Sequence, residues 1–439
     1  MKKYIAIAAT LVMMSFATHA SAASNFSSAK IDQSAGGAND AAIEQDDSNF
    51  SSADITQAGN TNLAEIEQTG DANTAAISQA GSLNEADVEQ AGNGNAATVA
   101  QLGDNNFVDV DQNGNNNSAS VSQQGNGNKV GEIKQVGDGN NAEVEQQGDG
   151  NAVTVAQTGN GNEADVEQIG NNNAADVAQT GYGNTSDVDQ NGASNQANVA
   201  QNGMSGFAEV EQTGFANSAS VEQDGTANTA NVEQLGNGNI ASVEQIGSSN
   251  NADVAQTGSS NNADADQVGN NNIASIEQMG SNNFAETEQN GNSNNAEIEQ
   301  SGNNNSADVF QTGNGNVADA EQIGDGNITE LAMLGDFNSV DIDQEGSLNS
   351  AFVNTAGSYN DINVEQSGDL NTANIDQMTS YADASIMQTG TGNTANISQT
   401  GAGTANARNT ASIEQDGSFN SANISQSGGA GNAASIVQN

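Results

Sequence analysis

The 439-residue chain contains no cysteine, no proline and no tryptophan, and its single histidine is His19. The absence of cysteine excludes disulfide bonds and thiolate metal sites. The absence of proline is typical of a continuous hydrogen-bonded ladder, because proline removes a backbone donor. Bases are also scarce: six Lys and Arg residues face 56 acids, which gives a formal net charge of −50. That charge argues against nucleic acid as a partner, since phosphates would be repelled.

The first 22 residues have the composition of a secretory signal peptide. Lys2 and Lys3 form a basic start, residues 5–16 are mostly apolar, and Ala20-Ser21-Ala22 offers a small-residue cleavage site. We expect cleavage after Ala22, which would remove His19 and change the formal charge from −50 to −52. The apolar run is too short to span a bilayer, and no later segment could do so. The sequence therefore predicts a secreted, extracellular protein that is not embedded in a membrane.

An 11-residue period runs through almost all of the remaining chain. Glutamine recurs at this spacing from Gln57 to Gln123 and, after a one-residue slip, from Gln135 to Gln399, with only Met333 and Thr355 replacing it. Low hydrophobicity with high net charge usually indicates disorder, but that rule describes aperiodic chains. A strict period instead indicates an array of one small structural unit.

The typical unit reads Ala-x-Val-x-Gln-x-Gly-x-x-Asn-x, as in residues 64–74. Ala, the branched aliphatic residue and Gln alternate with polar residues, which is the period-two pattern of a strand. The glycine that follows supplies a positive φ for a turn. One unit cannot bury its inner face alone, whereas stacked units can, which is the logic of a solenoid.

The repeated glutamines and asparagines are the candidate structural site. A buried amide without a partner costs about 1–3 kcal/mol, but identical amides stacked about 4.8 Å apart can bond to those above and below. We predict inward ladders of glutamine, with the asparagines closing the corners; the alternative for asparagine is a solvent-facing turn former. The predicted ladder residues are Gln68, Asn73, Gln79, Asn84, Gln90, Asn95, Gln101, Asn106, Gln112, Asn117, Gln146, Asn151, Gln157, Asn162 and Gln168.

Acidic residues indicate how many strands complete one turn. The residue before each glutamine alternates between acidic and uncharged units, as in Glu67, Ser78 and Glu89, and the alternation changes phase at the slip near residues 129–134. A 22-residue period therefore lies over the 11-residue one. We predict an all-β, cross-β solenoid of two facing sheets, one acidic and one bland. The 37 units between Gln33 and Gln438 give about 18 rungs of two strands.

The expected organisation is a signal peptide (1–22), irregular N-terminal repeats (23–56), regular solenoid repeats (57–399) and C-terminal repeats with a loop insertion (400–439). Substitutions at Thr379 and Ala382, and five extra residues between Gln399 and Gln415, predict bulging loops.

The unit resembles the curlin repeat, in which Gln, Gly, Asn, Ala and a second Gln recur at the offsets seen from Gln68 to Gln79. The resemblance extends over roughly residues 29–438. It implies a subunit of curli, the bacterial extracellular amyloid fibre of biofilms. It also implies export through a dedicated outer-membrane channel, accessory chaperone factors and a nucleating homologue. This chain departs from the common pattern in having many more repeats and a heavier acid load.

The sequence gives little support to an enzymatic function, so no catalytic residue and no cofactor are predicted. Pairs such as Glu65 and Glu67 recur along the chain, which is typical of a solvated strand face rather than of a catalytic cleft. Stacked carboxylates attract hard cations such as Ca²⁺, and we expect divalent ions, salt or acid to promote folding and assembly. Diffuse screening without defined sites is the simpler alternative.

Two functions remain open. The first is a secreted fibre subunit for biofilm matrix and cell adhesion that polymerises with itself end to end. The second is a monomeric, acidic extracellular solenoid that acts as an adhesin or cation-dependent surface binder. Its only candidate ligand face is the uncharged one that carries Thr98, Ala100, Ser120 and Ser122.

Overall fold

The computed structural model describes residues 17–22, 26–34, 36–401 and 403–439. All regular structure in these residues is β-strand. The chain divides into two compact units, a first unit of residues Met1–Ala216 and a second unit of residues Asn217–Asn439.

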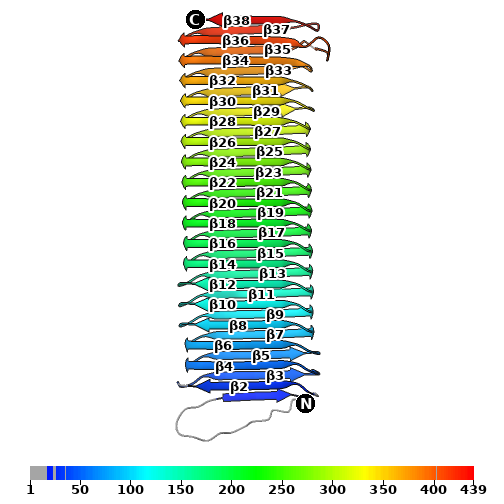
Figure 1. Cartoon of the computed structure of the whole chain (residues 1–439), viewed down its shortest axis with the longest axis vertical. Coiled ribbons are helices and arrows are strands. Elements are labelled where there is room, and N and C mark those ends of the chain that lie inside the picture. The colour runs from blue at the N-terminus through cyan, green and yellow to red at the C-terminus, as the bar shows by residue number, and fades with distance from the viewer. Residues whose placement is uncertain (1–16, 23–25, 35, 402) are drawn as a thin grey trace. The chain divides into compact units, whose positions relative to one another are not determined.

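Consecutive strands of the first unit alternate between two parallel sheets (Figure 1). The odd-numbered strands are β1 (Ala17–Ala22), β3 (Asp40–Asp46), β5 (Leu63–Thr69), β7 (Glu85–Asn93), β9 (Phe107–Asn115), β11 (Lys129–Asp138), β13 (Ala152–Asn160), β15 (Ala174–Tyr182) and β17 (Gln196–Met204). The even-numbered strands are β2 (Ser28–Ser34), β4 (Ser52–Asn60), β6 (Thr74–Ser82), β8 (Ala96–Leu102), β10 (Ser118–Gln124), β12 (Asn141–Gln147), β14 (Glu163–Asn171), β16 (Thr185–Ala193) and β18 (Phe207–Phe215).

The second unit repeats the same arrangement. Its odd-numbered strands are β19 (Ser218–Thr226), β21 (Ile240–Ser248), β23 (Asn262–Asn270), β25 (Phe284–Asn292), β27 (Ser306–Asn314), β29 (Ile328–Leu334), β31 (Ser350–Ala356), β33 (Thr372–Met378), β35 (Thr394–Gln399) and β37 (Ser421–Gln426). Its even-numbered strands are β20 (Thr229–Asn237), β22 (Asn251–Ser259), β24 (Ile273–Ser281), β26 (Asn295–Asn303), β28 (Val317–Asp325), β30 (Ser339–Ser347), β32 (Asp361–Asp369), β34 (Ala382–Thr391), β36 (Asn409–Ser418) and β38 (Ala433–Gln438).

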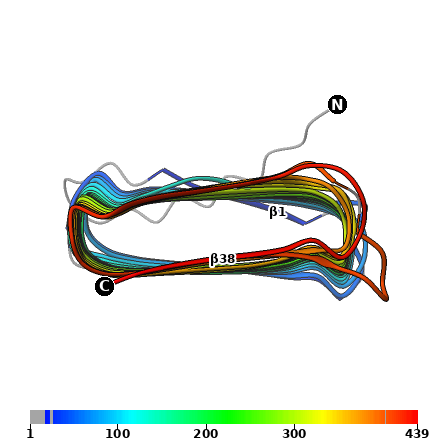
Figure 2. The ribbon, with the colours of Figure 1, turned by 90° about the horizontal axis from the view of Figure 1, so that it is seen from above.

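Two strands complete each turn, and their sheets face each other as the walls of a flattened coil (Figure 2). The predicted two-sheet β-solenoid is therefore confirmed. Strands β2–β38 correspond to the 37 units counted in the sequence. Strand β1 is additional: it lies inside the predicted signal peptide and pairs in parallel with β3, with Ala22 opposite Gln45. The rest of that predicted peptide, residues 1–16, lies outside the described residues.

The core of each unit comes mainly from three inward positions that recur from strand to strand. In β5 these are Ala64, Ile66 and Gln68, which are buried, while the residues between them are exposed. In-register pairing places each residue against the same position one turn later, so Ile66 lies beside Val88 and Gln68 beside Gln90. Alanine keeps the coil thin, and the branched residues supply most of the apolar burial.

Two of the predicted irregularities are present. The one-residue slip is absorbed by a bulge in β11, where the register shifts around Gly131. The extra residues after Gln399 form a loop in which Thr404 and Ala407 exchange backbone hydrogen bonds. The predicted bulging loop at Thr379 and Ala382 is wrong, because the strands on both sides of this corner pair in register and Asn360 bonds to Thr379 and Ala382 across it.

Candidate functional site

Along each sheet, the buried glutamines form side-chain hydrogen bonds with one another from turn to turn. In the odd sheet of the first unit, the Nε2 atom of Gln68 donates to Oε1 of Gln90 at 2.8 Å, and Gln90 donates to Gln112 at 2.7 Å. Each Nε2 atom makes a second bond to a backbone carbonyl in the opposite wall, as Gln68 does with Ser52 at 3.2 Å. Where the ladder is unbroken, the Oε1 atom of each glutamine accepts from the turn before and its Nε2 atom satisfies both donor hydrogens, so the ladder has a fixed direction.

The structure places every predicted ladder residue in the interior. All of them are at most 2% exposed: Gln68, Asn73, Gln79, Asn84, Gln90, Asn95, Gln101, Asn106, Gln112, Asn117, Gln146, Asn151, Gln157, Asn162 and Gln168. The predicted ladder asparagines are thus buried and do not face solvent.

The asparagines bond mainly to backbone rather than to one another. Asn73 accepts a hydrogen bond from the backbone N–H of Asn95 at 3.0 Å, and its own Nδ2 atom donates to the carbonyl of Gly92 at 2.9 Å. A few also form amide-to-amide bonds, such as Asn84 to Asn62 at 3.2 Å. The side chain of Asn73 therefore joins the corner of its own turn to the same corner of the next turn.

The glycine after each glutamine is required by close approach as well as by its φ angle. A Cβ atom on Gly70 would lie 2.1 Å from the carbonyl oxygen of Gly92. The tight left-handed position of the corner comes two residues later, where Ala72 has φ 59° and Leu83 has φ 62°. The turn was predicted at the glycine; the structure places the left-handed residue two positions later, where Gly or Asn stands in many turns but Ala, Ser and Leu also occur.

The ladders are incomplete at two places among the described residues. Met333 and Thr355 interrupt the odd ladder of the second unit, so the Oε1 atom of Gln377 is buried without a partner. Gln45, the first glutamine of the odd ladder in the first unit, has the same unpaired Oε1 atom. Its neighbour in β1 is Ala22, which has no amide to offer.

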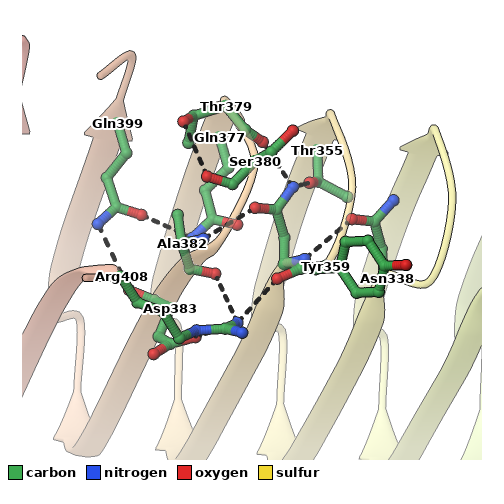
Figure 3. Close-up of polar contacts among 11 residues, drawn as sticks. Asn338, Thr355, Tyr359, Gln377, Thr379, Ser380, Ala382, Asp383, Gln399 and Arg408 are labelled. Carbon is green, nitrogen blue, oxygen red and sulfur yellow. Dashed lines mark hydrogen bonds and ion pairs between the residues drawn. The ribbon is translucent and has the colours of Figure 1, made fainter. Parts of the chain in front are cut away.

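The corner after Thr355 compensates for some of these losses (Figure 3). Asn360 donates to the hydroxyl of Thr355 at 3.0 Å and to the carbonyl of Thr379 at 2.7 Å, while its Oδ1 atom accepts from the backbone of Ala382. Thr379 therefore takes over the acceptor role of the missing corner glycine, which explains why the coil continues undisturbed.

Arg408 ties the inserted loop to this corner (Figure 3). Its guanidinium group pairs with the carboxylate of Asp383 and donates to the carbonyl of Tyr359 at 2.8 Å. Tyr359 is stacked between Phe337 and Tyr381, with ring centroids 5.2 and 5.0 Å apart. The sequence singled out Arg408 only as part of a loop, because its partners lie 25 and 49 residues away.

Acidic side chains lie outward in lines along the first unit. In the odd sheet Glu65, Asp87 and Asp109 are in-register neighbours. In the even sheet the line runs through Asp165 and Asp187. Because the bulge in β11 leaves the alternation of strands unchanged, the acids move from one sheet to the other there. Each sheet is therefore acidic over only part of its length.

This crowding shifts the titration of several acids. Partial burial, followed by the charges of Glu65 and Asp109, raises the pKa of Asp87 from 3.8 to about 6. Partial burial and the neighbouring carboxylates, Asp189 first, raise the pKa of Asp187 to about 6 as well. Nevertheless, the described residues contain no group of three or more His, Cys, Asp or Glu placed to hold a metal ion.

The repeat unit that forms these ladders matches the model of a known repeat family. Seventeen matches to the curlin associated repeat extend from residue 51 to residue 401, with a gap only at residues 332–334. The chain belongs to the curlin repeat family. The gap contains Met333, the first interruption of the glutamine ladder. No curated protein matches this curlin-repeat chain. Among the described residues, no helix is long and apolar enough to cross a membrane.

Proposed function

We propose that this chain is a secreted, non-enzymatic structural subunit that assembles end to end into curli-like extracellular amyloid fibres. The family and the fold point to a structural protein. The fibres would serve the biofilm matrix and adhesion at the cell surface. The proposal includes a nucleating homologue, a dedicated secretion channel and chaperone factors as partners, on the ground of the family alone.

The uncovered edge of β38 is the observation that supports this proposal. The inward residues of β38, which are Ala434, Ile436 and Gln438, are only half-buried, whereas every inward position of β36 is buried. Strand β38 pairs with β36 on one side, and no strand of this chain is described on the other. An uncovered, regular strand edge with an apolar inner face is a template for another strand.

The monomeric adhesin remains the alternative. A hollow with a volume of about 540 Å³ lies on the second unit, where it is lined by Phe310, Phe352 and Asn374 among others. The hollow is shallow, and its lining residues do not indicate a particular ligand.

The test is seeded growth of the secreted protein, followed by thioflavin fluorescence, electron microscopy and fibre diffraction. We expect fibres with a meridional spacing of about 4.8 Å. Ile436→Lys should stop elongation because it places a charge on the inward face of the end strand. Val437→Lys is the matched control, since Val437 is 57% exposed. A soluble monomer that persists at high salt and high concentration would support the adhesin instead.

A further inference from the structure

We propose that successive copies join with a switch of sheets, in which the even-numbered sheet of the incoming copy continues the odd-numbered sheet of the copy before it. Strand β2 of the incoming copy pairs with β37, and its β3 pairs with β38. This deepens the proposed function and rests on it, and also on removal of residues 1–22. It identifies the partner surface as the N-terminal edge of a second copy in one defined register.

The winding of the strands decides which edges meet. Within each unit a strand pairs with the strands two before and two after it. The next strand after β38 would therefore lie over β37 and the one after that over β38. In a copy that lacks β1, the first two strands are β2 and β3. Placing β2 over β38 instead would leave the position over β37 empty, with a strand edge unpaired on each side of the gap.

The side chains at these edges match in kind. When Gln426 faces Gln33, the inward residues Ala422 and Ile424 of β37 face Ala29 and Ile31 of β2. The inward residues of β2 are half-buried at this end, as expected for a face that awaits a cover.

The second strand pair completes the glutamine ladder. In this register Gln438 of β38 faces Gln45 of β3. The ladder always donates from one turn to the next, and Gln415 to Gln438 at 2.8 Å is its last step in the chain. The Nε2 atom of Gln438 holds one backbone bond, to Ser421 at 3.1 Å, which leaves its second hydrogen for a glutamine on the following turn.

Gln45 offers the acceptor that this hydrogen needs. Its side chain is 1% exposed, yet its Oε1 atom has no partner in the described residues. Strand β1 covers the edge of β3 with Ala22 at that register position. Strand β1 therefore occupies the place that the proposal assigns to β38 of the preceding copy, and its removal would open that place.

Paired cysteines can test the register, because the chain has no cysteine of its own. In the proposed junction Asp32 lies beside Ser425, at an in-register spacing of about 4.8 Å that suits a disulfide. Val437 lies on the outer face of the opposite wall, with the walls about 10 Å apart, and is out of reach. We would export the full chain as Asp32→Cys/Ser425→Cys and as Asp32→Cys/Val437→Cys, and verify the processed N-terminus by mass spectrometry.

Each variant is assembled under reducing conditions and then oxidised. A third variant, Ser412→Cys/Ser435→Cys, joins neighbours of β36 and β38 within one chain and reports whether oxidation works. We expect covalent oligomers from the Ser425 pair and at least ten-fold fewer from the Val437 pair. The reverse result overturns the sheet switch and leaves the proposed function intact. Fibres in which neither intermolecular pair forms a disulfide, while the internal control pair does, have the same consequence. Fibres built from a chain that retains residues 17–22 would also overturn it. A parent chain that forms no fibres overturns the proposed function, and the sheet switch with it.

Discussion

Among single residues, the glycine that follows each glutamine is the most constrained. Gly170 has φ 116°, and an added Cβ would lie 1.8 Å from the carbonyl oxygen of Gly192 on the next turn. Gly161 differs from it: its φ of 65° is left-handed, but nothing lies within 4 Å of an added Cβ. Alanine already occupies the same corner position elsewhere, as Ala72 does. The two glycines therefore separate steric crowding from backbone preference.

We expect Gly170→Ala to destabilise the protein far more than Gly161→Ala. The Gly161 variant has only to hold alanine in a left-handed conformation, at about 1 kcal/mol. The Gly170 variant must also push two adjacent turns apart, so its effect should be several times larger. Urea denaturation followed by circular dichroism measures both. Equal midpoints would show that the turns do not pack as closely as described.

The crowded acids make stability depend on pH. The pKa of Asp87 and that of Asp187 are each raised to about 6 in the folded chain, above the ordinary value of 3.8. The folded state therefore binds more protons than the unfolded state between these values, and stability rises as pH falls through that window. We expect a higher urea midpoint at pH 5 than at pH 7, at constant ionic strength.

Substitution of the two acids provides the control for that experiment. Asp87→Asn/Asp187→Asn removes two of the shifted carboxylates without changing their size, and should reduce the gain between pH 7 and pH 5. A midpoint that stays constant or falls on acidification would contradict the assigned shifts.

At the level of the strand, each hydrogen bond of the glutamine ladder depends on the residue at the same position one turn later. Gln311 keeps its backbone bond to Asn295 at 2.9 Å, but its neighbour Met333 cannot accept the second one. Thr355 leaves the Oε1 atom of Gln377 unpaired. These two interruptions are adjacent, so repair of one alone ends in another mismatch.

We therefore expect Met333→Gln and Thr355→Gln to be coupled. Together they would restore an unbroken ladder from Gln311 to Gln377, and the double variant should be more stable than the two single effects predict, by roughly 1 kcal/mol. A double-mutant cycle of denaturation midpoints measures this coupling. Strictly additive effects would argue against cooperation between stacked amides.

The same elements show what could be predicted from the sequence. The alternation of Ala, Val and Gln predicted the strands, and the acid period predicted two sheets, because both patterns are local and repeated. The left-handed corner position was missed although Gly or Asn often occupies it, as in Gly161 and Asn105, because residues such as Leu83 and Ala72 stand there in other turns. The contacts of Arg408 were not predictable either, because they depend on which turn the loop folds against. The unpaired oxygen of Gln45 depends on its neighbour in β1, a contact that periodicity does not reveal.

For the whole molecule, charge would decide how chains of the proposed fibre meet side by side. The formal net charge is −50, and the acids lie on outward faces rather than in the core. Repulsion between such faces acts over about 10 Å at 0.1 M salt and about 3 Å at 1 M. The junction proposed between copies is different, because there the uncharged Ser425 and Val437 face Asp32 and Glu44, so neither of these pairs brings like charges together. Charge therefore opposes lateral contact much more than axial growth.

We expect single, separate fibres at pH 7 and low salt, and laterally associated bundles at pH 4 or in 1 M salt. Acid neutralises the carboxylates, beginning with those whose pKa is already raised, such as Asp266, whereas salt screens all of them. Electron microscopy of fibres grown once and then divided between the conditions separates bundling from growth. Bundles at pH 7 and low salt would mean that attraction between the exposed apolar side chains, such as Ile246 and Met279, outweighs the repulsion of the acids.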